Sequence, residues 1–121
     1  MGKNILLVDD AAVVRHIVSL NLRKSGYDVV EAVNGQDALD KLDSSNVEMV
    51  ITDLNMPIMD GIELIKQIRK SIKFKFMPIL MLTTVSQEEK KLEGKQAGAS
   101  AWIFKPFHAH ELISMVRKYV G

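Results

Sequence analysis

The sequence predicts an α/β protein in which a doubly wound, parallel five-stranded sheet is covered on both faces by five helices. Two observations support this fold class. Short continuous apolar runs, which are typical of strands buried in a parallel sheet, recur along the chain. Between them lie segments whose apolar residues recur at helical spacing. Such alternation implies right-handed crossovers, and sheets of this kind bind ligands at the carboxyl ends of their strands.

The first two strand–helix units have clear boundaries. Residues 4–8 are an apolar run that leads into two carboxylates, Asp9 and Asp10. A helix is predicted next, because apolar residues recur at helical spacing: Val13, Val14, Ile17, Val18 and Leu20. Residues 25–26 (Ser-Gly) are expected to end this helix. Residues 27–33 predict the second strand. Asn34 is expected to cap the next helix, which has one apolar face: Ala38, Leu39 and Leu42.

The third unit delivers a single carboxylate. The apolar run of residues 49–51 leads into Asp53. The chain then leaves the strand, because Pro57 restricts its own backbone and that of the residue before it. Asp60-Gly61 is typical of a turn before a helix. Apolar residues mark that helix: Leu64, Ile65, Ile68 and Ile72.

The last two units end in hydroxyl and ammonium groups. Residues 78–84 predict a fourth strand that ends in Thr83 and Thr84. A helix of mixed charge follows from about residue 86 to residue 97, where Gly98 ends it. Residues 101–104 predict the fifth strand, which leads into Lys105 and Pro106. The final helix has apolar residues on one face: Leu112, Val116 and Tyr119.

Composition limits the class of protein. With 121 residues, 47% of them apolar, the chain is expected to form one globular domain, residues 1–121, without an output domain. The absence of cysteine excludes disulfides and thiolate metal sites. No signal peptide and no apolar stretch of the roughly 20 residues that span a bilayer are visible, so a cytoplasmic protein without membrane contact is expected. A net charge of +1 gives no reason to expect a nucleic-acid partner.

Polar side chains at the strand ends predict one site at the carboxyl edge of the sheet: Asp9, Asp10, Asp53, Thr83, Thr84 and Lys105. Crowded carboxylates repel one another by roughly 4 kcal/mol per pair at about 4 Å and an effective dielectric constant near 20. A hard divalent cation, Mg²⁺ or Mn²⁺, would relieve this repulsion. A phosphoryl group held by cation, ammonium and hydroxyl suits the same site, with a carboxylate nucleophile forming an aspartyl-phosphate.

A set of short motifs spans the chain in order: Val8-Asp9-Asp10, Thr52-Asp53-Leu54-Asn55-Met56-Pro57, Asp60-Gly61, residues 78–83, Ala97-Gly98-Ala99 and Lys105-Pro106-Phe107. Together these motifs resemble those of response-regulator receiver domains, and specifically the single-domain chemotaxis regulators of the CheY type. The resemblance implies a flavodoxin-like three-layer sandwich with strand order 2-1-3-4-5. It also implies a cis peptide bond before Pro106.

The resemblance further implies a phosphorylation site. Asp53 would be the phosphoacceptor. Asp10 and Asp53 would supply side-chain ligands to Mg²⁺, Asn55 would supply its backbone carbonyl, and Asp9 would act through a water molecule.

The same resemblance implies the parts of a switch. Thr83 would be the switch hydroxyl and Lys105 the ammonium that binds the phosphate. Trp102 stands where the family usually has the switch aromatic Tyr or Phe, and Phe104 shares its face of the strand. For both aromatic residues, core packing is the alternative interpretation.

Two positions depart from the commonest family pattern. Thr84 follows the switch threonine where Ala or Gly is usual, and Val85 stands where a polar group is frequent. Both positions are expected near the path of the water that hydrolyses the aspartyl-phosphate. The resemblance to the family therefore does not predict the lifetime of the aspartyl-phosphate in this chain.

The resemblance implies a monomer that a histidine kinase phosphorylates and that then binds a target protein, such as the flagellar motor switch, through the face around Trp102. A phosphatase would be a further partner. A phosphorelay shuttle and a phosphate sink are alternatives, and no turnover of an external substrate is expected. A Mg²⁺-dependent aspartate-nucleophile phosphatase would need Asp-x-Asp on the first strand, whereas Asp9 and Asp10 are adjacent. A flavin-binding module would need a loop rich in Ser, Thr and Gly after that strand, and the sequence lacks such a loop.

Overall fold

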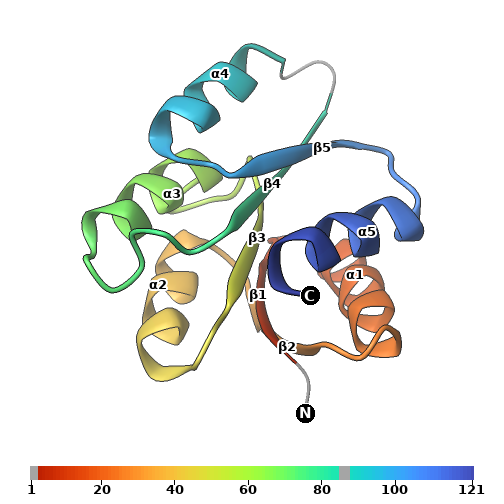
Figure 1. Cartoon of the computed structure of the whole chain (residues 1–121). Coiled ribbons are helices and arrows are strands. Elements are labelled where there is room, and N and C mark those ends of the chain that lie inside the picture. Colours follow the sequence, from red (N-terminus) through yellow and green to blue (C-terminus); the bar gives the residue numbers. More distant parts are fainter. Residues whose placement is uncertain (1–2, 85–87) are drawn as a thin grey trace.

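The computed structural model describes residues 3–84 and 88–121. The strands are β1 (Asn4–Val8), β2 (Asp28–Ala32), β3 (Met49–Asp53), β4 (Ile79–Thr84) and β5 (Ala101–Lys105). The helices are α1 (Ala12–Lys24), α2 (Gly35–Ser44), α3 (Gly61–Lys70), α4 (Glu88–Ala97) and α5 (Ala109–Val120). Strands and helices alternate along the chain as the sequence predicts (Figure 1). Within the described ranges no helix combines the length and the apolar character needed to cross a membrane.

The strands form one parallel sheet in the order β2-β1-β3-β4-β5, which confirms the order that the resemblance implies. Figure 1 shows α1 and α5 on one face of the sheet, and α2, α3 and α4 on the other. Each face has its own buried apolar core, so the molecule has three layers. β1 lies between β2 and β3, and the direction of winding changes there. Ligands of such sheets bind at this switch point, outside the carboxyl ends of the strands.

Local signals in the sequence determine where two helices begin. The side chain of Asn34 caps α2, because its Oδ1 accepts a hydrogen bond from the backbone N–H of Asp37 at 2.8 Å. Asp60 caps α3 in the same way, accepting from the N–H of Glu63 at 2.9 Å. Both caps satisfy backbone donors that the first helical turn leaves unpaired. The helix start expected at Asn34 and the turn expected at Asp60-Gly61 are therefore confirmed.

The end of α3 differs from the prediction. The helix stops at Lys70, and Ile72, expected on its apolar face, is 93% exposed in the following loop. Phe74 is the loop residue that packs into the core instead. Arg69 stabilises this arrangement, because its guanidinium donates to the backbone carbonyls of Phe74 and Lys75, each at 3.1 Å. These bonds hold the chain in a loop conformation that a continued helix would not allow.

The apolar spacing predicts the helix α1 but does not identify the face that it buries. Val18 and Leu22 pack against the sheet, whereas Val13, Ile17 and Leu20 are exposed. The prediction of a helix in this segment is confirmed. Periodicity located the helix, but apolar residues occur on both of its faces and so did not identify the buried one.

Candidate functional site

Three carboxylates meet at the carboxyl edge of the sheet. Asp9 and Asp10 follow β1, and Asp53 is the last residue of the neighbouring strand β3. One carboxylate oxygen from each of the three lies within 4.8 Å of the others. The apolar runs of β1 and β3 bury these strands side by side, so their parallel pairing brings the acids together. The convergence predicted from the sequence is therefore observed.

Lys105 joins the acids from the far side of β4. It ends β5, and its Nζ lies 2.8 Å from Oδ1 of Asp53 and 3.9 Å from Oδ2 of Asp9. The peptide bond that follows, between Lys105 and Pro106, is cis, as the resemblance implies. An ammonium among three carboxylates leaves the site with excess negative charge, which attracts cations.

Asp9 is the most deeply buried of the acids, with 1% of its surface exposed. Burial raises the pKa of its carboxyl above the ordinary value of 3.8, and the nearby charge of Asp53 raises this pKa further. A hydrogen bond from the backbone N–H of Ala11 and the charge of Lys105 act in the opposite direction on this pKa. Oδ2 of Asp9 is buried and has no hydrogen-bond partner among the described residues. A buried carboxylate oxygen without a hydrogen bond is costly unless a bound cation or an ordered water satisfies it.

The donor set fits a hard divalent cation. It consists of carboxylate oxygens in different environments: Asp9 is buried, Asp53 is half-buried and Asp10 is exposed. Asn55 lies in the loop directly after β3, where its backbone carbonyl remains a predicted ligand. Oxygen ligands with partial access to solvent suit Mg²⁺, which usually keeps several of its own water molecules.

Thr83 lies at the same edge of the sheet, near the end of β4. It is fully buried, and its hydroxyl donates to the backbone carbonyl of Thr84 at 3.5 Å. In the sheet register Thr83 pairs with Phe104 and Thr84 pairs with Lys105. The switch hydroxyl proposed from the resemblance is thus next to an aromatic residue of β5. Val85, the second unusual position, lies outside the described residues.

Trp102 and Phe104 lie on the face of β5 that meets α4. The ammonium nitrogen of Lys91, from α4, lies 4.7 Å from the ring centroid of Trp102 and 5.5 Å from that of Phe104. Both rings are half-buried, and both border a groove of about 720 Å³ between β5 and α5. Trp102 also packs against the core beneath α4. Trp102 thus packs against the core, as the alternative interpretation expects, and also borders the groove. Its role as the switch aromatic stays a prediction.

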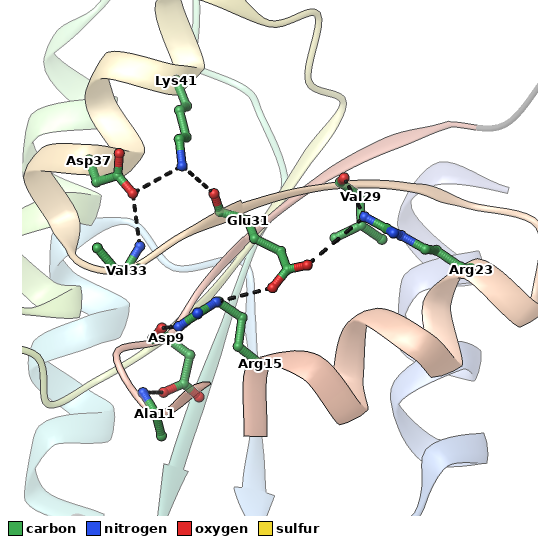
Figure 2. A network of polar contacts seen from close by, with 9 residues as sticks. All are labelled: Asp9, Ala11, Arg15, Arg23, Val29, Glu31, Val33, Asp37 and Lys41. Atoms are coloured by element: carbon green, nitrogen blue, oxygen red, sulfur yellow. Dashed lines mark hydrogen bonds and ion pairs between the residues drawn. The ribbon is translucent and has the colours of Figure 1, made fainter. Parts of the chain in front are cut away.

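Two residues that lie behind the acids are not predictable from the sequence pattern. Arg15 of α1 donates from Nη1 to the backbone carbonyl of Asp9 at 2.7 Å and from Nε to Oε1 of Glu31 at 3.1 Å (Figure 2). A single arginine in a helix and a single glutamate in a strand are typical of solvated surface, so their residue types carry no signal. Only the fold brings them together.

Comparison with known proteins places this chain in a class. The family model of the response regulator receiver domain matches residues 5–117. The chain belongs to this family, whose members bind Mg²⁺ in an acidic site and interact with histidine kinases and downstream targets.

Particular relatives are also recognisable. The chain is similar to the chemotaxis protein CheY4 of Vibrio cholerae, with 40% identity and a TM-score of 0.92 over 98% of this chain and 99% of that one. The receiver domain of a sensor histidine kinase from Pseudomonas aeruginosa, solved with a magnesium ion in its active-site cleft, is 27% identical, with a TM-score of 0.92 over 100% of this chain and 99% of that one.

A third relative is the alkaline phosphatase synthesis transcriptional regulatory protein PhoP of Bacillus subtilis. It is 39% identical over 117 residues, which cover 97% of this chain and 48% of PhoP. The chain thus spans about half the length of this curated relative.

Proposed function

We propose that this chain is the phosphorylated switch of a two-component system, in which Asp53 accepts a phosphoryl group from a histidine kinase beside a bound Mg²⁺. The observation that carries the proposal is the convergence of Asp9, Asp10 and Asp53 within 4.8 Å, with the ammonium of Lys105 2.8 Å from Asp53. The Mg²⁺ ligands would be the carboxylates of Asp10 and Asp53 and the carbonyl of Asn55, while Asp9 binds through water. Bound Mg²⁺ supplies positive charge that offsets the phosphoryl oxygens and the acids.

The chain's own groups account for the transfer. A carboxylate oxygen of Asp53 attacks the phosphorus of the kinase's phosphohistidine, so that an O–P bond forms while the N–P bond breaks. The imidazole leaves with the electron pair of that bond. Lys105 then contacts a phosphoryl oxygen instead of the free carboxylate, and the hydroxyl of Thr83 donates to another. This last contact changes the environment of Phe104, which pairs with Thr83 in the sheet.

The kinase would dock beside the acids, on α1. This helix begins three residues after Asp9, and an apolar stripe on its solvent side consists of Val13, Ile17 and Leu20. Exposed apolar patches of this kind mark protein interaction sites. The stripe would place a kinase helix next to Asp53 without covering the groove between β5 and α5.

The target would dock in that groove, which Trp102 and Phe104 border. Similarity to CheY4 supports a chemotaxis target, such as the flagellar motor switch, for a monomeric protein of the cytoplasm. Similarity to PhoP favours a second candidate, a role in transcriptional control. The partner captured by the phosphorylated but not by the unphosphorylated protein would separate these two roles.

Labelling with a small phosphodonor tests the proposal directly. Acetyl phosphate with Mg²⁺ should label the parent protein and leave Asp53→Asn unlabelled, since the substitution removes the nucleophile but keeps the side-chain volume. Asp60→Asn is the matched control, because Asn caps a helix as well as Asp does and the residue is exposed. Undiminished labelling of Asp53→Asn would contradict the proposal. Turnover of phosphomonoesters by the parent would instead support the phosphatase alternative.

A further inference from the structure

Hydrogen bonds hold every polar atom of Asp9 except one carboxylate oxygen. Its N–H donates to the carbonyl of Ala32 at 3.1 Å, and its Oδ1 accepts from the N–H of Ala11 at 2.9 Å. Its backbone carbonyl accepts from Nη1 of Arg15 at 2.7 Å. Only Oδ2 lacks a hydrogen bond in the described part of the chain, and it lies 3.9 Å from the ammonium of Lys105. The bonds to the other atoms determine where Oδ2 points.

Arg15 is itself held in place by Glu31. Its Nε donates to Oε1 of Glu31 at 3.1 Å, and the two side chains are only 17% and 34% exposed. Glu31 lies in β2, at the edge of the sheet, where the ammonium of Lys41 binds its backbone carbonyl at 2.6 Å. Figure 2 shows the resulting chain of contacts from α2 through β2 and α1 to the end of β1.

We infer that Arg15, oriented by Glu31, is a positioning residue for divalent cation binding at the acid cluster. This inference rests on the proposed function, because it names a determinant of the Mg²⁺ site. The planar guanidinium bonds a carbonyl and a carboxylate at the same time, which fixes the backbone at Asp9 and the direction of Oδ2. A lysine has no fork of this kind. Arg15 does not itself contact the cation.

Electrostatics alone predicts that Arg15 weakens Mg²⁺ binding, which is the opposite of what a positioning role predicts. Its positive charge close to the acids repels a divalent cation, so loss of the charge alone would strengthen Mg²⁺ binding. Loss of positioning would weaken it. Groups that orient metal ligands typically contribute about 10- to 100-fold to metal affinity. The sign of the change therefore decides between the two effects.

The experiment measures the Mg²⁺ dissociation constant of the full chain by titration calorimetry. Arg15→Gln should raise this constant about tenfold, and Arg15→Lys, which keeps the charge, should also raise it. Arg23→Gln is the matched control. Arg23 lies on the same helix, donates to the carbonyl of Val29 at 3.1 Å and approaches Glu31 at 3.9 Å, but does not contact Asp9. The Mg²⁺ dissociation constant of Arg23→Gln should stay within about twofold of that of the parent protein. Unchanged or tighter binding by both Arg15 variants would overturn the inference.

A second readout needs no metal. The N–H of Ala11 is bonded to Asp9, so its hydrogen exchange reports how firmly that carboxylate is held. In metal-free protein this amide should exchange faster in Arg15→Gln than in Arg23→Gln, after each rate is corrected for global stability. Equal protection would overturn the inference. If Arg15→Gln does not fold, Glu31→Gln takes its place and should give a smaller effect of the same sign.

The two readouts also separate this inference from the proposed function. A parent protein that binds no Mg²⁺ would count against the proposed metal site, while the exchange of Ala11 would still show whether Arg15 positions Asp9. A parent that binds Mg²⁺ and is labelled on Asp53, together with Arg15 variants that behave like it, would refute the positioning role alone.

Discussion

The ammonium of Lys105 lies 2.8 Å from Oδ1 of Asp53, although the two residues end strands that are separated by β4. The same ammonium lies 3.9 Å from Oδ2 of Asp9. One cationic side chain thus offsets the charge of two of the three clustered carboxylates. A divalent cation and a phosphoryl group would both change this pairing, the first by adding positive charge and the second by offering Lys105 new oxygen acceptors.

Lys105→Gln should therefore have two effects of opposite sign. Mg²⁺ should bind the variant more tightly, because a positive charge close to the cation is removed. Labelling by acetyl phosphate should be slower by about tenfold or more, because a charged donor to the transferred group is lost. Calorimetry and labelling kinetics would measure the two effects. Lys118→Gln, on the exposed part of α5, is the control and should change neither. Weaker Mg²⁺ binding by Lys105→Gln would contradict this electrostatic description.

Asp9→Asn should stabilise the metal-free protein at neutral pH. The carboxylate of Asp9 is buried beside Asp53, and its Oδ2 is unsatisfied among the described residues. Removing the charge relieves the desolvation and the repulsion, by an amount on the order of 1–3 kcal/mol. Asp10→Asn should stabilise less, because Asp10 is exposed. Urea unfolding with and without Mg²⁺ would measure this, and the Asp9 variant should gain less stability than the parent when Mg²⁺ is added.

The pH dependence follows from the raised pKa of Asp9. A carboxyl whose pKa is higher in the folded state than in the unfolded state binds its proton more tightly when folded. Its contribution to stability is therefore greatest below the unfolded value of 3.8 and is lost as the pH rises through the folded pKa. The advantage of Asp9→Asn over the parent should accordingly shrink as the pH falls towards 3.8. An advantage that grows on acidification would contradict the direction of the shift.

Much of this site is predictable because parallel topology converts a local pattern into a spatial one. An apolar run that leads into a carboxylate, as at Asp9 and Asp53, identifies the end of a buried strand. The fold class alone then places all such ends at one edge. The hydroxyl of Thr83 and the ammonium of Lys105 follow from the same rule. The strand order and the cis bond before Pro106 came from family resemblance, since no local pattern determines them.

The features that were missed depend on contacts between distant segments. Arg69 binds the carbonyl of Gly98 at 2.8 and 3.0 Å as well as loop carbonyls after α3, and this long-range anchor ends the helix before Ile72. Arg15 finds Glu31 only after β2 has paired with β1. Long polar side chains satisfy backbone carbonyls wherever the fold brings them. Their residue types do not indicate which carbonyl they will reach.

Gly61 is required where the loop after β3 returns to the strand. Its N–H donates to the carbonyl of Leu54 at 2.8 Å, and a Cβ at this position would overlap the backbone carbonyl oxygen of Asp53. A backbone atom cannot rotate away as a side chain does. Gly61→Ala should therefore destabilise the protein by about 2 kcal/mol or more. It should also slow labelling of Asp53 in the fraction that stays folded. Urea unfolding and acetyl phosphate labelling would measure these effects.

Gly26→Ala provides the comparison for Gly61. Gly26 has a φ of 96° and open space around its missing Cβ, so the substitution strains the local backbone without touching the site. It should cost about 1 kcal/mol and leave the labelling rate of folded protein unchanged. Equal losses of labelling in the two variants would mean that the close approach of Gly61 to Asp53 has no bearing on the reaction.

Trp102 reports on the coupling between the acids and the groove. Its ring lies under the ammonium of Lys91, which also lies over Phe104, and Phe104 pairs with Thr83 at the site. When a phosphoryl group draws the Thr83 hydroxyl towards Asp53, the space next to β5 changes. We expect Trp102 to move inward, because burial of the indole removes apolar surface from water. Its contact with Lys91 opposes this movement by roughly 0.5–1 kcal/mol.

Steady-state fluorescence and acrylamide quenching with Mg²⁺ and beryllofluoride, a mimic of the phosphoryl group, would test this movement. The mimic should shift the emission of Trp102, the sole tryptophan, to the blue and reduce its quenching. Lys91→Met should show part of both changes without the mimic, because the contact that holds the ring outward is lost. Lys95→Met is the control, since Lys95 lies beside Trp102 in the same shallow pocket but makes no ring contact among the described residues. An unchanged spectrum in protein shown independently to bind the mimic would rule out this coupling. Identical spectra of the two lysine variants would instead rule out the role of Lys91, because loss of either charge would then account for them equally well.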